Sequence, residues 1–571
     1  MAEFNKAFFQ GLWKLVKDYW QSEEKFKAIG LLIVVALLNF FGVYILILIN
    51  EWYNTFYNAL QEYNQDAFWS LVLKFLILAF IYIFSAVYAL YLRQMLEINW
   101  RNWMTKLYLK RWLQLQTYYK MQVISDNTDN PDQRISEDIK SFTSLTLQLL
   151  MGFLKQLATL LAFIFVLWRL SGEFTFSLSG HQITIYGYMV WLSLIYAVVG
   201  TWLTAKIGKP LIKLNYDQQR YEADFRFNMV RLRENSESIA FYGGEEQENS
   251  GFYNKFKYVF KNFYGLMKYQ KRLTWFTNGY GQLAIIFPLL LGAPRYFSGK
   301  IQLGGLMQIN SAFGRVQDAL SFFVDSYSTL AEWRAVVKRI TDFSDNMDKA
   351  AMLQSDIEFM KNGNKNLFID KMEVSLPKGD ILIRDLDMDL NLGSRVLITG
   401  ASGCGKSTFL RTLAGLWPFG KGLVKMPEND KKIFLPQKPY LPLGTLKSAL
   451  AYPQNIEKIN NKDFENIMDK CQLSHLKGSL DVEDDWSRIL SLGEQQRIAF
   501  ARTLLFKPQW IFLDEATSAL DEKTEQIMYE ILDNELKDST IISIGHRNTL
   551  RKYHQYNLQI DNNGKWIMEN I

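Results

Sequence analysis

A glycine-rich stretch in the final third of the chain has the composition of a phosphate-binding loop. Residues 400–408 read GASGCGKST and follow an apolar stretch, 396–399, that we expect to be a strand. The match to G-x-x-x-x-G-K-[ST] between a strand and a helix predicts backbone N–H groups that face the phosphates of a nucleotide. The predicted phosphate-contacting residues are Gly400, Ala401, Ser402, Gly403, Cys404, Gly405, Lys406, Ser407 and Thr408.

Two side chains of this loop and two acids further on have the chemistry for magnesium and a nucleotide. Lys406 is expected to reach the β- and γ-phosphates, and Ser407 to ligate Mg²⁺. A second motif, WIFLDEA at 510–516, predicts a buried strand that ends in two acids. Asp514 is placed to hold Mg²⁺ through water, and Glu515 to orient and deprotonate the attacking water. Such a strand is common in α/β folds, but after a phosphate loop it predicts ATP hydrolysis.

The order of five motifs resembles the nucleotide-binding domain of ATP-binding cassette (ABC) proteins. They are the phosphate loop, Gln437 in FLPQKPYLP, LSLGEQQR at 490–497, FLDEATSALD at 512–521 and His546 in SIGHR. The resemblance implies that two copies of the domain share ATP. It also implies that Gln437 senses Mg²⁺, that Asp521 crosses the seam between the copies, and that His546 contacts the γ-phosphate.

The stretch LSLGEQQR departs from the family's usual LSGGQ at two positions. Leu492 stands where a glycine is expected, and Glu494 where a glutamine is expected. By the family pattern Ser491 and Gly493 bring a hydroxyl and an N–H group to the γ-phosphate, and both are present. A helix is expected to follow them, and its N-terminus favours an anion. We therefore expect a working clamp in which Ser491, Gly493 and Glu494 belong to the nucleotide site.

Another departure concerns the base of the nucleotide. These domains usually stack adenine on an aromatic residue before the first core strand. Alignment on the phosphate loop puts Leu376, in VSLPKG, at that position. Either adenine stacking is weak or another residue supplies it.

The chain before residue 326 contains long apolar runs of the length that a bilayer requires. A spanning helix needs about 20 mostly apolar residues, and the candidates are 28–50, 68–92, 146–168, 186–205, 276–297 and 303–325. The last is weak because it contains several polar and charged residues, and the alternative is an amphipathic cytosolic helix. Ionisable groups inside spans usually face a cavity or another helix. Lys155, Arg315 and Asp318 are therefore candidates for a substrate cavity, with an internal ion pair or a cytosolic helix extension as the alternative.

The distribution of basic residues predicts which side of the membrane each segment occupies. Lys and Arg are dense before residue 28, in 93–145 and in 206–275, whereas 51–67 and 171–185 have none. Because basic loops stay in the cytosol, both termini and the nucleotide-binding domain are expected there. These loops also account for the net charge of +6, so no nucleic acid is expected as a partner.

The predicted fold class is an α-helical six-span transmembrane domain of the exporter type, followed by an α/β P-loop nucleotide-binding domain. The predicted domains are an N-terminal interfacial helix (1–27), a transmembrane domain with six helices and two long cytosolic loops (28–340), a linker (341–365) and the ABC nucleotide-binding domain (366–571). This order resembles an exporter-type half-transporter, which must dimerise.

Four further motifs are similar to a narrower family, which contains peroxisomal subfamily D transporters and bacterial SbmA/BacA-type importers. They are NPDQRISEDI (130–139), ENSESIAFYGGEEQE (234–248), GLWP (415–418) and PQKPYLPLGTL (436–446). The resemblance implies a homodimer in a bacterial inner membrane that binds ATP and Mg²⁺ and imports bulky hydrophilic solutes such as cobalamin or peptides. The alternatives are an exporter, a transporter of lipid or fatty acyl-CoA, and a membrane-anchored ATPase that acts on a partner protein.

Overall fold

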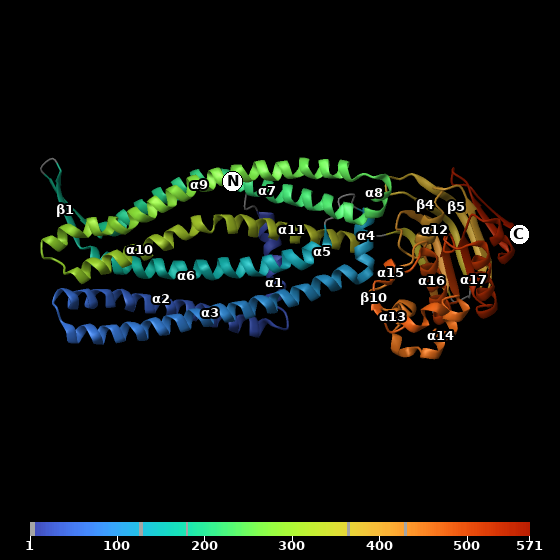
Figure 1. Cartoon of the computed structure of the whole chain (residues 1–571), viewed down its shortest axis with the longest axis horizontal. Coiled ribbons are helices and arrows are strands. Elements are labelled where there is room, and N and C mark those ends of the chain that lie inside the picture. The colour runs from blue at the N-terminus through green and yellow to red at the C-terminus, as the bar shows by residue number, and fades with distance from the viewer. Residues whose placement is uncertain (1–5, 125–129, 179–180, 354, 363–365, 428–430) are drawn as a thin grey trace. The chain divides into compact units, whose positions relative to one another are not determined.

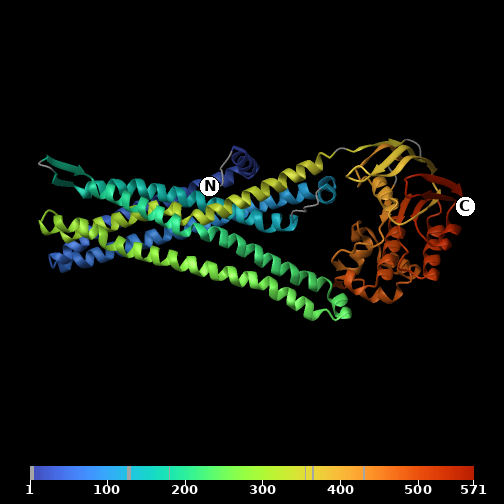
Figure 2. The same cartoon turned by 90° about the horizontal axis from the view of Figure 1, so that it is seen from above.

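The computed structural model describes residues 6–124, 130–178, 181–353, 355–362, 366–427 and 431–571. Contacts divide the chain into two units. One comprises residues 1–111 and 129–345 and is built mainly from long helices (Figure 1). The other comprises residues 112–128 and 346–571 and is built around two sheets with helices packed on them (Figure 2). A helical region followed by an α/β domain is the predicted architecture.

Long helices form the first unit, and several run far beyond the thickness of a bilayer. The stretches Lys25–Gln61, Gln65–Val123, Pro131–Ser171, Tyr188–Glu234 and Glu245–Phe297 are long and apolar enough to cross a membrane. They contain the first five predicted spans, except that the predicted span 186–205 begins two residues before Tyr188. The helices are α1 (Lys6–Trp20), α2 (Lys25–Gln61), α3 (Gln65–Leu113), α5 (Pro131–Gln133), η2 (Arg134–Asp138), α6 (Ile139–Ser171), α7 (Tyr188–Glu234), α8 (Ser236–Tyr242), α9 (Glu245–Phe297), α10 (Leu303–Asp325) and α11 (Tyr327–Ala351).

The sixth predicted span, 303–325, is not confirmed. These residues form α10, but in the described part of the chain only the five stretches above have the length and hydropathy for a crossing. α10 packs against α2, α6, α7 and α9, and its side chains Ile309, Phe313 and Val316 are buried. Because neighbouring helices cover it, its polar residues need not meet lipid.

Amide side chains fasten α10 to α2. Asn50 donates to the backbone oxygen of Gln308 (3.0 Å), and Asn54 donates to its Oε1 (2.8 Å). Asn58 Oδ1 accepts the N–H of Gly304 at 2.8 Å, and a Cβ on Gly304 would collide with the backbone oxygen of Asn54. Breaking one partner of a buried bond leaves the other unsatisfied, so these contacts fix the packing of the two helices.

A buried carboxylate joins the start of α6 to α11. Asp138, at the end of the π-helical turn η2, accepts hydrogen bonds from Arg134 (2.6 Å) and from two nitrogens of Arg339 (2.6 and 2.9 Å). A charge can be buried at tolerable cost when cations pair with it. Arg134 and Asp138 belong to the motif NPDQRISEDI, so part of this motif serves packing within the helical unit.

Three predicted segments differ in detail from the elements that occupy them. The region 1–27 contains α1 and the start of α2, with residues 1–5 outside the described part. The loop expected at 171–185 forms a hairpin of β1 (Glu173–Leu178) and β2 (His181–Tyr186). The linker expected at 341–365 contains the end of α11 and the strand β3, apart from residues 354 and 363–365, which are not described.

Two main sheets organise the second unit. The strand order is β14-β13-β6-β12-β11-β8 in one and β3-β7-β4-β5 in the other. The strands are β3 (Asp356–Asn362), β4 (Asn366–Ser375), β5 (Ile381–Asn391), β6 (Arg395–Gly400), β7 (Gly420–Pro427), β8 (Lys432–Leu435), β11 (Trp510–Asp514), β12 (Thr540–Ile544), β13 (Tyr556–Ile560) and β14 (Trp566–Asn570). In the first sheet the pairs from β8 to β13 are parallel, and β14 is antiparallel to β13. β11 and β12 are buried along almost their whole length, which suits their continuous apolar sequences.

Helices surround these sheets, and the longer ones position the loops of the candidate site. They are α4 (Thr117–Ile124), α12 (Lys406–Leu413), α13 (Leu446–Ala451), α14 (Asn461–Lys470), α15 (Trp486–Ile489), α16 (Leu492–Phe506) and α17 (Glu522–Glu535), with short 3₁₀ turns that include η4 (Ser474–Ser479). A short two-stranded ladder joins β9 (Gly444–Thr445) to β10 (Glu483–Asp484). α4 groups with this unit, and its side chain Val123 packs against the core.

A buried histidine makes the stability of this unit depend on pH. His554 Nδ1 donates to the backbone oxygen of Leu550 (2.8 Å), and Nε2 accepts from the hydroxyl of Ser543 (2.9 Å). Burial lowers the pKa of His554 to about 4. The unfolded chain binds this proton near pH 6.5, whereas the folded chain binds it only near pH 4. The contribution of His554 to the free energy of unfolding is therefore fully present above pH 6.5 and is lost as the pH falls toward 4.

We predict that His554 contributes a loss of about 2 kcal/mol in the free energy of unfolding between pH 7 and pH 5. Urea unfolding of the detergent-solubilised protein at the two pH values measures it. The His554→Asn variant is expected to be less stable but to lack this part of the pH dependence. An unchanged pH dependence in the variant would contradict the prediction.

Candidate nucleotide-binding site

Parallel strands deliver their carboxyl ends to one edge of the six-stranded sheet. Leu435 of β8 lies opposite Leu513 of β11, Asp514 lies opposite Ile544 of β12, and Ile544 lies opposite Ile398 of β6. The predicted functional residue Gly400 ends β6, and the chain leaves the other three strands for Gln437, Glu515 and His546. Residues that are far apart in sequence therefore reach the same edge, which is where open α/β sheets bind ligands.

The phosphate loop takes backbone conformations that suit glycine. Gly400, Gly403 and Gly405 have φ angles of +148°, +86° and +101°, a region that residues with a Cβ rarely adopt. A Cβ on Gly400 would also collide with the backbone oxygen of Ile560, and one on Gly405 would lie 3.0 Å from Leu382 Cβ. All nine predicted residues lie in this loop and the first turn of α12.

Lys406 begins α12 and holds its charge over the loop. Its Nζ donates to the backbone oxygens of Gly400 (2.9 Å) and Ala401 (2.8 Å), and the residue is buried. Cys404 is buried in the same loop, and Cys471, which follows α14, is buried as well. Burial raises the pKa of the Cys471 thiol to about 12. In the phosphate loop, Lys406 is the positively charged side chain available to contact an anion.

Ser407 and Asp514 meet behind this loop. The Ser407 hydroxyl donates to Asp514 Oδ1 at 2.8 Å. Burial raises the pKa of Asp514, and the charge of Glu515 adds to this rise, while the bond from Ser407 and the charges of Arg411 and Lys406 oppose it. The two residues predicted to serve Mg²⁺ therefore place oxygen atoms side by side, and oxygen is the donor that Mg²⁺ prefers.

Glu515 is aimed by two other predicted residues. Its φ is +49°, which is uncommon for a residue with a Cβ, and such backbone strain is typical of functional sites. Oε2 accepts from Gln437 Nε2 at 3.1 Å, and Oε1 lies 3.2 Å from His546 Nε2. The structure thus brings Gln437, Glu515 and His546 into direct contact.

One functional position was missed by sequence reasoning, although it lies within LSLGEQQR. Gln496 is fully buried, and its Nε2 donates to the backbone oxygen of Gln437 (2.8 Å) and to the hydroxyl of Ser518 (3.2 Å). Its Oε1 accepts the N–H of Ala519 (3.0 Å). A single amide therefore ties the segment before α13 to the segment after Glu515. A polar side chain among the apolar positions of a buried helix was the available signal.

The stretch LSLGEQQR opens helix α16 with a capping box. The Ser491 hydroxyl accepts the N–H of Glu494 (3.3 Å), and the Glu494 carboxylate accepts the N–H (3.0 Å) and hydroxyl (2.8 Å) of Ser491. A Cβ on Gly493 would lie 3.2 Å from the backbone oxygen of Ala519. Burial alone would raise the pKa of Glu494, but hydrogen bonds from Ser491 and His475 lower it overall. Glu494 therefore carries a negative charge at neutral pH.

Asp521 caps the neighbouring helix α17. Its carboxylate accepts the N–H (2.9 Å) and the hydroxyl (2.8 Å) of Thr524, and these bonds lower the pKa of Asp521. Beneath this loop, buried Glu525 accepts from the hydroxyls of Thr517 (2.7 Å) and Thr549 (2.9 Å). Asp521 is thus exposed on a loop that the domain itself holds in place.

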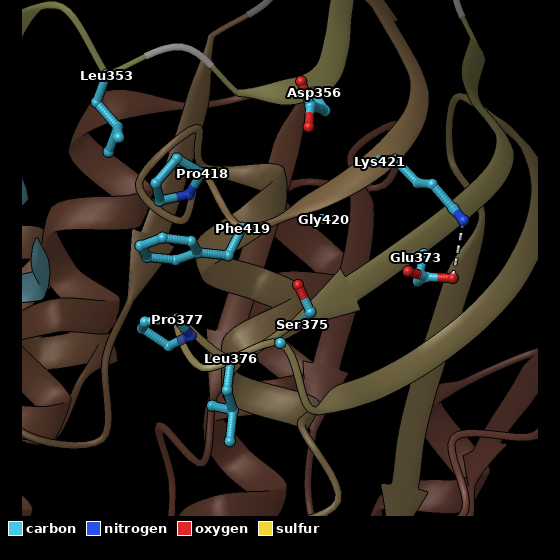
Figure 3. A pocket seen from close by; sticks show the side chains of 11 residues that line it. Leu353, Asp356, Glu373, Ser375, Leu376, Pro377, Pro418, Phe419, Gly420 and Lys421 are labelled. Atoms are coloured by element: carbon cyan, nitrogen blue, oxygen red, sulfur yellow. Dashed lines mark ion pairs between the residues drawn. The ribbon is translucent and has the colours of Figure 1, made fainter.

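Leu376 lines a cavity of about 370 Å³ at the edge of the second sheet (Figure 3). Its side chain offers a methyl surface at the position where the family resemblance implies an aromatic ring. Phe419 lines the same cavity and accepts the N–H of Ser375 with its backbone oxygen (3.1 Å). Lys421 and Glu373 form an ion pair of 3.3 Å along its wall.

The three residues predicted for a substrate cavity lie on neighbouring helices of the first unit. Lys155 is on α6, Arg315 and Asp318 are on α10, and these helices pack together. Arg315 and Asp318, both within the described residues, form no ion pair. A hollow of about 680 Å³ lies along α9, between Met267 and Gln282, and none of the three lines it.

Comparison with known proteins identifies the family to which the chain belongs. The family described as ABC transporter transmembrane region 2 matches residues 15–297, and the family described as ABC transporter matches residues 383–518. An ABC transporter ATP-binding protein of Haemophilus influenzae is 38% identical over 97% of this chain and 92% of that protein. The chain belongs to the ABC transporter family. It carries a transmembrane region and an ATP-binding domain in one polypeptide, as predicted.

Further relatives refine the position of this ABC transporter. The inner membrane ABC transporter ATP-binding protein YddA of Escherichia coli is 34% identical over 93% of this chain and 94% of that protein. ABC transporter D family member 2, chloroplastic, of Arabidopsis thaliana is 34% identical over 99% of this chain and 89% of that protein. The predicted relation to subfamily D is confirmed. The SbmA/BacA-type assignment stays a prediction.

A solved structure has the same fold. A bacterial Atm1-family ABC exporter with ATP bound aligns with a TM-score of 0.73 and 18% identity, over 95% of this chain and 94% of that chain. The predicted exporter-type fold is therefore confirmed. The ABC transporter is a multi-pass half-transporter, a class that typically dimerises, and its ATPase activity is coupled to transport.

We predict that Gln496→Ala destabilises the ABC transporter by about 1–3 kcal/mol, since buried groups on two segments lose their partner. ATP turnover should fall as well, because Gln437 and the segment after Glu515 lose their common tie. Urea unfolding and ATPase assays measure the two effects. Gln526→Ala is the control, because this exposed glutamine bonds along its own helix, to Glu530. Equal urea midpoints for the two variants would contradict the prediction.

Proposed function

We propose that the ABC transporter is a homodimer that uses ATP hydrolysis to move a solute across a bacterial inner membrane. The observation that carries the proposal is the carboxylate of Glu515, which Gln437 and His546 aim at the sheet edge where the phosphate loop also begins. Such an arrangement suits a group that takes a proton from water beside a γ-phosphate.

In the proposed reaction each side chain has one task. Lys406 binds the β- and γ-phosphates, together with the backbone N–H groups of residues 400–408. Glu515 accepts a proton from the attacking water, whose oxygen bonds to the γ-phosphorus as the bond to ADP breaks. His546 contacts the γ-phosphate, and Gln437 orients the Glu515 carboxylate. Turnover thus needs a correctly placed base as well as bound ATP.

Mg²⁺ is the proposed metal cofactor, with Ser407, Asp514 and Gln437 as its protein contacts. No group of three or more His, Cys, Asp or Glu within the described ranges is arranged to hold a metal ion. This suits Mg²⁺, which usually takes one or two carboxylates and completes its shell with nucleotide oxygens and water. When bound, it neutralises charge on the β- and γ-phosphates.

The second half of each ATP site is proposed to come from the other copy. Ser491, which is exposed, and Gly493 and Glu494, which are partly exposed, lie at the start of α16, whose N–H groups favour an anion. Asp521 lies on an exposed loop near Gly493, because a Cβ added to Gly493 would lie 3.2 Å from the backbone oxygen of Ala519, two residues before Asp521. Two copies facing each other would then enclose two equal sites, which favours a homodimer.

The proposed transport cycle uses the closing of two ATP-binding domains to switch a cavity between the two sides of the bilayer. Basic loops support cytosolic termini and a cytosolic ATP-binding domain. Lys155, Arg315 and Asp318 are the proposed polar groups of the cavity. The proposed cargo is a bulky hydrophilic solute such as cobalamin or a peptide. The second candidate is an exporter or a transporter of lipid or fatty acyl-CoA, which the resemblance to subfamily D implies.

We predict that Glu515→Gln leaves ATP binding intact and lowers turnover by about 10²–10⁴-fold, since an amide cannot accept the proton. Steady-state ATPase activity and equilibrium binding of ATP to purified protein in lipid nanodiscs measure the two effects. The matched control is Glu522→Gln on the exposed first turn of α17, which should hydrolyse ATP normally. Normal turnover in Glu515→Gln would remove Glu515 from its proposed role.

The cargo is tested by uptake of labelled cobalamin into cells that lack other cobalamin importers. We predict uptake with the wild type and none with Glu515→Gln at equal protein levels. That result would establish substrate, direction and energy source together. Equal lack of uptake, with ATP hydrolysis by the wild type confirmed, would rule out cobalamin and direct the search to peptides, lipids and fatty acyl-CoA.

A further inference from the structure

His475 faces the carboxylate that takes the place of the usual glutamine in LSLGEQQR. Its Nε2 lies 2.9 Å from Glu494 Oε1, while the N–H and hydroxyl of Ser491 both donate to Oε2. An ionised carboxylate can only accept hydrogen bonds, so the proton of the first contact belongs to His475 Nε2. Glu494 is therefore held at one oxygen by Ser491 and at the other by His475.

Among the described residues, Glu494 is the side chain that His475 contacts through a hydrogen bond. The side chain of His475 is 55% exposed and that of Glu494 only 20%. Asp469, on the preceding helix α14, is occupied by Lys477 (2.5 Å) and Ser474 (2.7 Å). The contact thus joins the 3₁₀ turn η4 to the start of α16.

Arg497 places a cation near the same carboxylate oxygen. Its Nη2 lies 4.0 Å from Glu494 Oε1, while its Nη1 donates to the backbone oxygen of Gln472 at 2.7 Å. His475 and Arg497 therefore both approach Glu494 Oε1, the oxygen that does not contact Ser491. Negative charge is drawn toward Oε1 and away from the exposed hydroxyl.

An ionised Glu494 conflicts with the proposed role of Ser491. The hydroxyl hydrogen of Ser491 is directed at Glu494 Oε2, yet in the proposed dimer it has to be donated to the γ-phosphate of ATP. A carboxylate next to a phosphate also repels it, which a neutral glutamine would not do. A donor at Oε1 weakens both effects, because it lowers the charge and the basicity of the carboxylate.

We propose that His475 is a positioning residue. It acts through Glu494 to free the Ser491 hydroxyl for the γ-phosphate of ATP. The inference rests on the proposed function, since the phosphate belongs to ATP held by the other copy. It assigns to η4, outside every ATP-site motif, a part in nucleotide affinity. His475 itself need not touch the nucleotide.

The test compares ATP affinity among variants that also carry Glu515→Gln, so that hydrolysis does not intervene. His475→Ala is expected to raise the Kd for ATP about tenfold, which corresponds to about 1.4 kcal/mol. His475→Gln retains an N–H donor and should raise it less. With Glu494→Gln present, His475→Ala should have no further effect, because the carboxylate that it serves is gone.

Lys477→Ala is the matched control, because it removes a cation from the same turn without touching Glu494. It should leave the Kd unchanged, and equal thermal unfolding midpoints confirm that all variants fold. In proteins that retain Glu515, His475→Ala should raise the KM for ATP with little change in kcat. An unchanged Kd, or an equal rise with and without Glu494→Gln, overturns the inference.

The outcomes separate this inference from the proposed function. Normal turnover by the Glu515→Gln parent would remove the proposed base, and the KM comparison in proteins that retain Glu515 would then carry the test. Absence of ATP binding in every variant and in the wild type would overturn both. A rise in Kd that Glu494→Gln abolishes supports the role of His475 whatever the transported solute is.

Discussion

The in-register pairing of the parallel strands β8, β11, β12 and β6 is the constraint on which the nucleotide site depends. Burial of their apolar side chains holds the ladder together, and the register then sets the height at which each strand ends. A slip of one residue would move Glu515 by about 3.3 Å and turn its neighbours to the opposite face of the sheet. The contacts of Glu515 with Gln437 and His546 would not survive it.

Polar side chains behind the site turn this edge into a rigid surface. Gln496 bonds to segments on both sides of the site, and buried Glu525 secures the loop that ends in Asp521. In a low-dielectric interior each such bond is costly to break. The same device recurs in the helical unit, where amides join α2 to α10 and Asp138 joins η2 to α11. Both units thus use buried polar bonds to fix packing that apolar contacts alone would leave less specific.

Sequence predicted the parts of the site whose chemistry lies in adjacent residues. The phosphate loop leads from β6 into α12, and the acids Asp514 and Glu515 lie at the carboxyl end of β11. The partners of Gln496 and His475 could not be predicted, because they lie 59 and 19 residues away and only the fold brings them together. The helix at 303–325 shows the reverse limit. Its polar residues depress hydropathy, yet the amides of α2 satisfy Gln308, so composition alone says little about its surroundings.

The enclosure of both cysteines has a practical consequence. Cys404 lies inside the phosphate loop and Cys471 is sealed beneath the surface, where its thiol stays protonated. Maleimides and spin labels react with accessible thiolates, so the wild-type chain presents little that they can modify. A cysteine introduced at an exposed position would therefore carry a probe without prior removal of the native ones. Distances between such probes on the two copies of the proposed dimer can then be followed through the nucleotide cycle in an otherwise unaltered chain.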